Sequence, residues 1–164
     1  MNLALPQTFT KYTPYAITLD EYIQSTDEKK VRAVFETMQK AWSNNDVTLF
    51  DACFTEESDF VSFRGEHLKR TENNISKRVQ FSKTRLYINI KSIRFLNNEL
   101  AVVHAEGAIL QDYETVSGSC KLSYNTNILI KENGEWKITS FHNSKKEKAG
   151  LGERIIKWLM GSKR

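Results

Sequence analysis

Apolar residues recur every three or four positions between residues 27 and 43, which is the period of a helix that buries one face. The apolar positions of this stretch are Val31, Val34, Phe35, Met38 and Trp42. Ser25, Thr26 or Asp27 can each cap the N-terminus of such a helix. Residues 1–26 carry both prolines and show no sustained period, so we expect an N-terminal arm before the helix.

Two further helices and a short strand are predicted before residue 83. Asparagines end the first helix, and Asp46 can cap a short second helix that contains Phe50. A brief strand is expected at Asp59–Phe63. Residues 66–82 have a sparse apolar stripe at helical spacing, which predicts a third helix.

Apolar and polar residues alternate from Lys83 onward, as they do in strands with one buried face. The apolar residues of the first such strand are Leu86, Ile88, Ile90, Ile93 and Phe95. Their change from even to odd positions predicts a β-bulge near Lys91 and Ser92, and therefore a bent strand.

Three more alternating segments follow. Residues 100–110 carry small and branched apolar side chains at odd positions, whereas residues 122–130 carry theirs, with Tyr124 among them, at even positions. The dipeptide Asn133-Gly134 is a strong hairpin signal before a last strand at 136–142. Helices followed by an antiparallel meander predict an α+β domain.

The composition is that of one globular domain. With 164 residues, of which 40% are hydrophobic and 27% charged, the chain can bury a single core. Two cysteines are too few for a disulfide framework. The sequence shows neither a leader peptide nor an apolar run long enough to span a membrane, so we expect a cytoplasmic protein.

The net charge of +4 is concentrated at one end of the chain. Residues 145–164 hold seven basic and two acidic residues, so the rest of the chain is close to neutral. Because no nucleic-acid-binding motif accompanies this charge, no nucleic-acid partner is expected. The sequence has no metal-ligand spacing, phosphate-binding loop or nucleophile elbow, so no metal or cofactor is expected.

Three strings resemble the SnoaL-like group of the nuclear transport factor two superfamily, most closely its SgcJ/EcaC branch. They are AWSNNDVTLFDACFTEESDFVSFRGEHL at 41–68, AVVHAEG at 101–107 and WKITSFHNS at 136–144. The resemblance implies a cone, in which a strongly curved antiparallel sheet wraps N-terminal helices and leaves an apolar pocket. We therefore expect a cone domain over 27–144, between an arm at 1–26 and a basic tail at 145–164.

Proteins of this fold include ketosteroid isomerases, dehydratases and polyketide cyclases, together with members of no known reaction. The resemblance implies a domain, expected to be a homodimer, that binds an apolar or aromatic metabolite. Two alternatives stay open, because a fold does not determine a function. One is a cofactor-independent isomerase, cyclase or dehydratase that uses acid–base chemistry, and the other is a protein- or membrane-interaction module that uses the tail.

His142 and Asp59 are the candidate catalytic residues. Alternation along the last strand places His142 on the face of Trp136 and Ile138, and an inward imidazole could act as a general acid or base. A structural hydrogen bond at the strand end is the commoner role of such a histidine. Asp59 could be a base at the pocket mouth, although a solvated turn residue is the commoner case.

The resemblance makes five aromatic residues candidates for the wall of a ligand pocket: Trp42, Phe50, Phe60, Tyr124 and Trp136. A plain core explains the same spacing. The hydroxyl of Tyr124 needs a partner when it is buried, and a ligand could supply one. His104 and Glu106 are expected on the convex side of the sheet, and His67 at the rim without an assigned role.

The tail ends in AGLGERIIKWLMGSKR, which has a wide apolar arc on a helical wheel. Three interpretations compete: it docks on the cone or on a partner subunit, it lies on an anionic membrane surface, or it is disordered. Docking is favoured, because one short helix with a few cations binds membranes only marginally. The lysines at 145–148 keep the membrane surface as an alternative.

Overall fold

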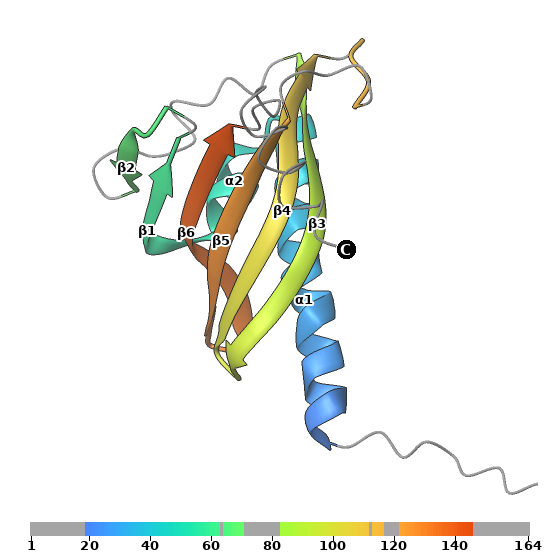
Figure 1. The fold of residues 1–164 in the computed structure, drawn as a ribbon, viewed down its shortest axis with the longest axis vertical. Coiled ribbons are helices and arrows are strands. Elements are labelled where there is room, and N and C mark those ends of the chain that lie inside the picture. Colours follow the sequence, from blue (N-terminus) through green and yellow to red (C-terminus); the bar gives the residue numbers. More distant parts are fainter. Residues whose placement is uncertain (1–18, 63, 71–82, 112, 117–121, 146–164) are drawn as a thin grey trace, which may run out of the picture.

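The computed structural model describes residues 19–62, 64–70, 83–111, 113–116 and 122–145. Two helices come first, α1 (Leu19–Ser43) and α2 (Val47–Ala52). The strands follow: β1 (Phe54–Val61), β2 (His67–Lys69), β3 (Thr84–Asn97), β4 (Leu100–Gln111), β5 (Ser123–Glu132) and β6 (Glu135–Lys145). This order confirms the predicted α+β class (Figure 1).

Helix α1 is longer than the sequence pattern predicts. It begins at Leu19 instead of Asp27, so residues 19–26, expected in the arm, are helical. Asp27 lies inside the helix and is only 4% exposed. Its carboxylate accepts hydrogen bonds from Lys131 Nζ at 2.7 Å and from Trp136 Nε1 at 3.1 Å, which satisfies a charge at a buried position. Residues 1–18 of the expected arm and residues 146–164 of the tail lie outside the described part.

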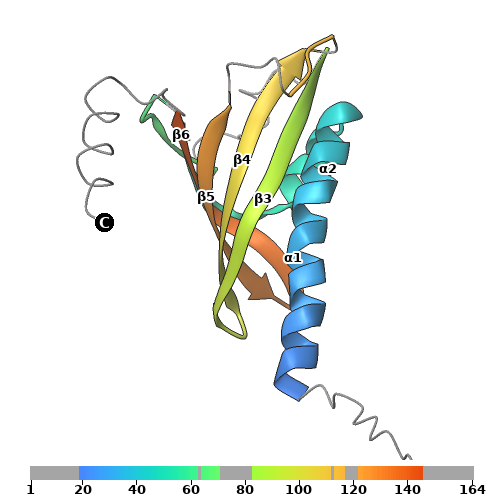
Figure 2. The same cartoon turned by 45° about the vertical axis from the view of Figure 1, so that its right-hand side comes forward.

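The strands form one sheet in the order β2-β1-β6-β5-β4-β3. Neighbouring strands are antiparallel except for β1 and β6, which run parallel. The sheet is therefore mixed and not wholly antiparallel as the resemblance implied. It curves around α1 without closing on itself, as the two views show (Figures 1 and 2).

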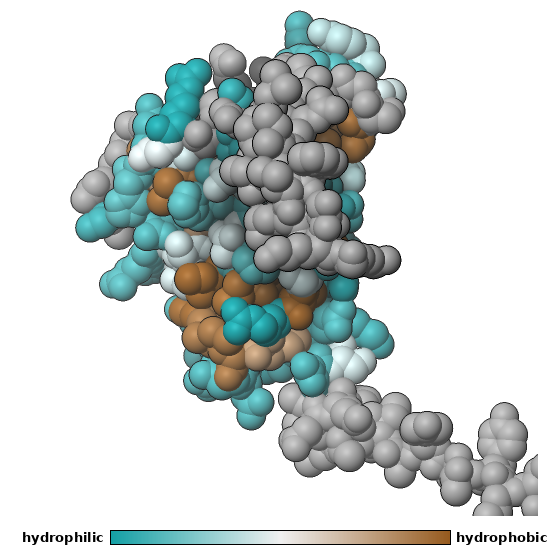
Figure 3. Space-filling view, in the orientation of Figure 1, coloured by the Kyte–Doolittle hydropathy of each residue, from teal (hydrophilic) through white to brown (hydrophobic). Residues whose placement is uncertain are grey.

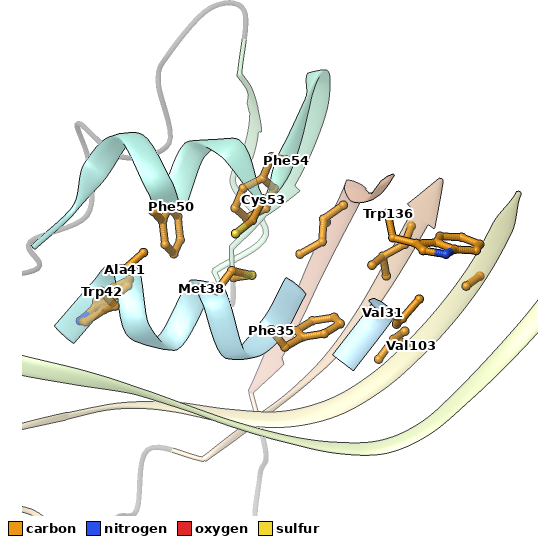
Figure 4. Packing of buried hydrophobic residues seen from close by; sticks show 13 residues of the cluster. Val31, Phe35, Met38, Ala41, Trp42, Phe50, Cys53, Phe54, Val103 and Trp136 are labelled. Atoms are coloured by element: carbon orange, nitrogen blue, oxygen red, sulfur yellow. The ribbon is translucent and has the colours of Figure 1, made fainter. Parts of the chain in front are cut away.

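The core lies between α1 and the concave face of the sheet. Helix α1 contributes Phe35 and Met38, each 2% exposed, and β4 contributes Ala101 and Val103, which are fully buried. Figure 4 shows that Phe50, Cys53 and Phe54, which come from α2 and the start of β1, face the C-terminal half of α1. Helix α2 begins at the predicted cap, where Asp46 accepts a hydrogen bond from the backbone N–H of Leu49 at 2.9 Å.

Strand β1 starts earlier than predicted, and the expected third helix is wrong over its first residues. β1 begins at Phe54, five positions before Asp59, and the side chain of Phe54 is buried in the core. Residues 67–69 form β2, in which Leu68 pairs with Phe60 of β1. Hydrogen bonding to the free edge of β1 therefore outweighs the weak helical spacing of the apolar residues in this segment. Residues 71–82 of that expected helix lie outside the described residues.

Arg70 holds an irregular stretch of β1. Between Phe54 and Asp59 the pairing with β6 is interrupted, so the backbone there lacks its ladder partners. The guanidinium Nη1 of Arg70 donates to the carbonyl oxygens of Phe54 and Thr55 at 2.8 and 2.9 Å. The backbone N–H of Arg70 donates to the Ser58 carbonyl at 2.9 Å. One side chain thereby replaces missing strand contacts.

Two bulges decide which side chains face the core. The predicted bulge of β3 is confirmed, because its pairing with β4 shifts between Ile90 and Ser92. A second bulge, which the sequence did not reveal, lies in β6: Ile138 pairs with Leu129 while Ser140 pairs with Ile128, so Thr139 is the extra residue. After Thr139 the inward residues of β6 therefore stand at odd positions.

The predicted buried face of β5 is wrong. Its pairing with the buried odd positions of β4 turns Asn125, Asn127 and Leu129 inward, with exposures of 5%, 0% and 0%. Tyr124 and Ile128 lie on the outer face. Both faces of this strand are partly apolar, so alternation in the sequence could not tell the two apart.

Candidate functional site

A cavity of about 400 Å³ opens at the wide end of the fold, between the helices and the concave face of the sheet. Its volume is in the usual range of small-molecule sites. Apolar side chains from both helices and four strands form most of its lining: Met38, Trp42, Phe50, Phe54, Phe60, Leu86, Ile88, Ala108, Ile109, Leu122 and Phe141. Gly107, Ser123, Asn125, Asn143 and Lys145 complete it.

Aromatic rings form two groups in this lining. Phe50 packs edge-on against Trp42, with ring centroids 5.8 Å apart, and tilts against Phe54 at 5.4 Å. Phe60 and Phe141 stack with centroids 4.8 Å apart and an interplanar angle of 10°. The indole Nε1 of Trp42 donates to Thr84 Oγ1 at 3.0 Å, so the ring presents an apolar surface to the cavity.

A polar strip crosses this apolar lining along β5 and β6. Asn125 and Asn143 are paired residues on the two strands, and Ser123 and Lys145 form the pair two positions nearer the open end. Asn127, deeper along β5, donates from Nδ2 to the Asn125 Oδ1 at 2.8 Å. The strip is fixed by backbone pairing and by this hydrogen bond.

Three of the five aromatic residues predicted from the resemblance line the cavity: Trp42, Phe50 and Phe60. The other two do not. Trp136 is 4% exposed in the core at the opposite end, where it bonds Asp27 and packs edge-on against Phe95. Tyr124 is 46% exposed on the outer face, because the face of β5 that is buried is the opposite of the predicted one.

His142 does not face the cavity, because the bulge at Thr139 reverses the alternation that placed it with Trp136. All three histidines of the chain instead lie on one cross-strand row of the outer face. Val61 pairs with both His67 and His142, and Thr126 pairs with both His142 and His104. The convex position expected for His104 is thus confirmed, with its Nδ1 3.1 Å from Thr126 Oγ1.

Asp59 also points away from the cavity, because it precedes Phe60, whose ring lines it. Its Oδ2 lies 3.3 Å from Nε2 of His67 on the outer face. The two candidate catalytic residues, His142 and Asp59, are therefore neither in the cavity nor paired with each other. The predicted inward orientation of His142 is wrong, and Asp59, expected at the pocket mouth, is not among the lining residues.

The lining is poor in groups that transfer protons. Among the described lining residues Lys145 is the single side chain that titrates, and no carboxylate or imidazole is present. The nearby thiol of Cys53 is buried, which raises its pKa to about 11 and keeps it protonated at neutral pH. In the described part of the chain, no group of three or more histidine, cysteine, aspartate or glutamate residues could hold a metal ion.

Solved structures share this architecture. A domain of unknown function with a cystatin-like fold from Nostoc punctiforme superposes with a TM-score of 0.62 at 23% identity, over 85% of this chain and 88% of that one. A nuclear transport factor two-like protein of unknown function from Shewanella oneidensis gives a TM-score of 0.57 at 18% identity, over 73% of this chain and 99% of that one. The chain therefore has the cystatin-like fold of these solved structures.

The same cone fold occurs in an enzyme. A hexachlorocyclohexane dehydrochlorinase superposes with a TM-score of 0.64 at 11% identity, over 77% of this chain and 90% of that one. At such identities the likeness concerns the cone fold alone. No protein-family model matches the sequence, and no curated protein matches it. No described helix is long and apolar enough to cross a membrane.

Sequence reasoning missed the polar strip and two of the five aromatic lining residues, Phe54 and Phe141. Phe141 and Asn143 follow the unpredicted bulge, so alternation assigned them to the wrong face. Asn125 stands at a position that the sequence pattern marks as polar and therefore exposed. The one hint was Leu129, an apolar residue at an odd position of the same strand, which shows that the odd face of β5 could also be the buried one.

Proposed function

We propose that this protein binds an apolar small molecule in the cavity of the cone. The observation that carries the proposal is the lining itself, in which aromatic and aliphatic side chains predominate around a volume of about 400 Å³. Ile109 supports it, because this side chain is 47% exposed although it belongs to the concave face. Covering such surface with an apolar ligand is favourable.

The composition of the lining favours binding over acid–base catalysis. An isomerase, cyclase or dehydratase working by proton transfer needs a titrating group within hydrogen-bond reach of its substrate. Both predicted candidates, His142 and Asp59, lie on the outer face instead. The enzyme alternative would require a residue that the sequence did not single out.

Filling the cavity is expected to weaken binding strongly. N-phenyl-1-naphthylamine, a neutral apolar probe whose fluorescence rises in dry sites, should bind the full chain saturably. Ile109→Trp should weaken this binding at least about tenfold, because the larger side chain occupies space that is now empty. Fluorescence titration measures the dissociation constant.

Val47→Trp is the matched control, since Val47 is 39% exposed on α2 and does not line the cavity. It should leave the dissociation constant unchanged. If the wild-type chain gives no saturable signal, or if both variants bind as the wild type does, the proposed binding site is refuted.

We further propose that this chain forms a homodimer, as the family resemblance implies. An apolar patch on the outer face supports it: Leu96 and Ile128 are 49% and 37% exposed, and Leu100, Val102 and Ile130 are half-buried beside them. Figure 3 views this outer face and shows apolar side chains gathered over its lower part. Exposed patches of this kind commonly mark protein interfaces.

Ile128→Lys is expected to convert the dimer to a monomer, because it places a charge in the middle of the patch. Light scattering coupled to size-exclusion chromatography gives the mass directly. Val47→Lys, an equally exposed change on α2, should leave the mass unchanged. A monomeric wild-type chain at tens of micromolar would contradict the homodimer.

A further inference from the structure

The polar strip of β5 and β6 restricts what the cavity can accept. Asn125 is 5% exposed, and its amide oxygen already accepts a hydrogen bond from Asn127. A Cβ at position 107 would lie 3.1 Å from Asn125 Nδ2, so the glycine gives the amide nitrogen room beside the cavity lining. Asn125 therefore presents a hydrogen-bond donor there.

Asn143, paired with Asn125 across the two strands, presents the complementary group. Its Oδ1 is buried and has no hydrogen-bond partner among the described residues. A buried acceptor without a partner is destabilising, so such atoms usually receive a bond from water or a ligand. A donor and an acceptor are then carried by paired residues in a mostly apolar wall, and together they complement a hydroxyl group.

Lys145 adds a charge at the open end of the same strip. It lines the cavity, is exposed, and stands two residues beyond Asn143 on β6. Two residues of strand span about 7 Å. Lys145 is the charged side chain among the described lining residues, and an ammonium group has three N–H donors with which it can bind an anionic group of a ligand.

We propose that the ligand is a hydroxylated apolar acid, with its hydroxyl bound between Asn125 and Asn143 and its anionic group at Lys145. This assignment rests on the proposed binding function and gives it a chemical class. The hydroxyl accepts from Asn125 Nδ2 and donates to Asn143 Oδ1. A rigid body of one or two rings spans the separation of about 7 Å and fills the aromatic lining.

Matched naphthalene probes test the hydroxyl. In calorimetric titrations of the full chain, 6-hydroxy-2-naphthoate should bind about fivefold more tightly than 2-naphthoate, which lacks the hydroxyl group. In Asn143→Leu this ratio should fall to about one. Asn89→Leu, on the outer face of β3, should keep the wild-type ratio.

The same variant has a readout without any ligand. Because Leu removes an unpartnered buried acceptor, Asn143→Leu should raise the melting temperature of the free protein while lowering affinity for the hydroxylated probe. An amide that serves only the fold would show the opposite change, a lower melting temperature with an unaltered probe ratio.

A second pair of probes tests the anionic group. 6-Hydroxy-2-naphthoate should bind about threefold more tightly than its neutral amide at low salt, and the preference should decrease as salt is added. Lys145→Gln should abolish the preference, whereas Lys137→Gln, on the outward side of β6, should retain it.

The outcomes separate this inference from the proposed function. If the apolar probe binds and Ile109→Trp blocks it, but hydroxylated and unhydroxylated probes bind equally to the wild-type chain, the cavity is a binding site and the hydroxylated acid is refuted. If neither the apolar probe nor any naphthalene binds, the proposed function itself fails. The ratio of the affinities of the hydroxylated and unhydroxylated probes is measured on the wild-type chain. It therefore tests the hydroxyl assignment even where a variant does not fold.

Discussion

Asp27→Ala is expected to lower the free energy of unfolding by about 3 kcal/mol, because it breaks a buried ion pair from one side. The Asp27 carboxylate is 4% exposed and joins α1 to the last hairpin through Lys131 and Trp136. Without it, the ammonium of Lys131, 5.4 Å above the Trp136 ring, loses its counter-charge, and the indole N–H loses its acceptor. Urea unfolding at neutral pH measures the change.

The neighbouring Glu28 provides the control. It pairs with Arg32 at 2.7 Å, but both side chains are about half exposed. Glu28→Ala should therefore lower the free energy of unfolding by no more than about 0.5 kcal/mol. A loss for Asp27→Ala as small as that of Glu28→Ala would show that the buried network contributes little.

The Asp27 network also gives the stability a pH dependence. Burial alone would raise the pKa of Asp27, but the hydrogen bonds from Lys131 and Trp136 and the charges of Lys131 and Lys30 hold it below its ordinary value of 3.8. Its stabilisation is therefore fully present above that ordinary value and is lost as the pH falls through the lower pKa of the folded state. Asp27→Asn should lack this component of the acid transition.

Arg70→Ala is expected to lower the free energy of unfolding by about 2–3 kcal/mol, because it removes two charge-assisted hydrogen bonds to part-buried carbonyl oxygens. Phe54, one of the two acceptors, lines the cavity, so the change should also weaken binding of the apolar probe. Chemical unfolding and the fluorescence titration measure the two effects.

Arg70→Lys keeps the charge without the fork of donors and should recover part of the loss. Arg94→Ala removes an exposed arginine of β3 and should change the stability by less than about 0.5 kcal/mol. If Arg70→Ala matches Arg94→Ala, the irregular stretch of β1 does not depend on this side chain.

The sequence predicts the elements better than it predicts the faces of the strands. The period of α1, the Asp46 cap and the Asn133-Gly134 turn depend on neighbours a few positions away, and the structure has all three. The bulge at Thr139 depends on pairing with β5, and the side chain of Thr139 accepts a hydrogen bond from Thr55 Oγ1 of β1 at 3.3 Å. Such distant partners leave no local pattern.

The same limit explains the candidate site. Trp42 and Phe50 reach the cavity because both are on helices whose buried face is visible in the sequence. Strict alternation along β6 predicts an inward His142, and the resemblance makes Tyr124 a candidate for the cavity wall. One extra residue in β6 reverses the alternation beyond it, and the inner face of β5 carries asparagines. The predicted inward-facing and outward-facing residues of these strands are therefore exchanged.

The parallel pairing of β1 with β6 has a consequence for synthesis. Phe54 pairs with Ile138 and Val61 with His142, so the strand that follows the helices has its central partner in the last described hairpin. Chains are made from the N-terminus, and pairing of distant segments is slow. The edge of β1 that β6 covers therefore lacks its strand partner on the ribosome until β6 has emerged, and an unpaired strand edge of this kind can pair with other chains.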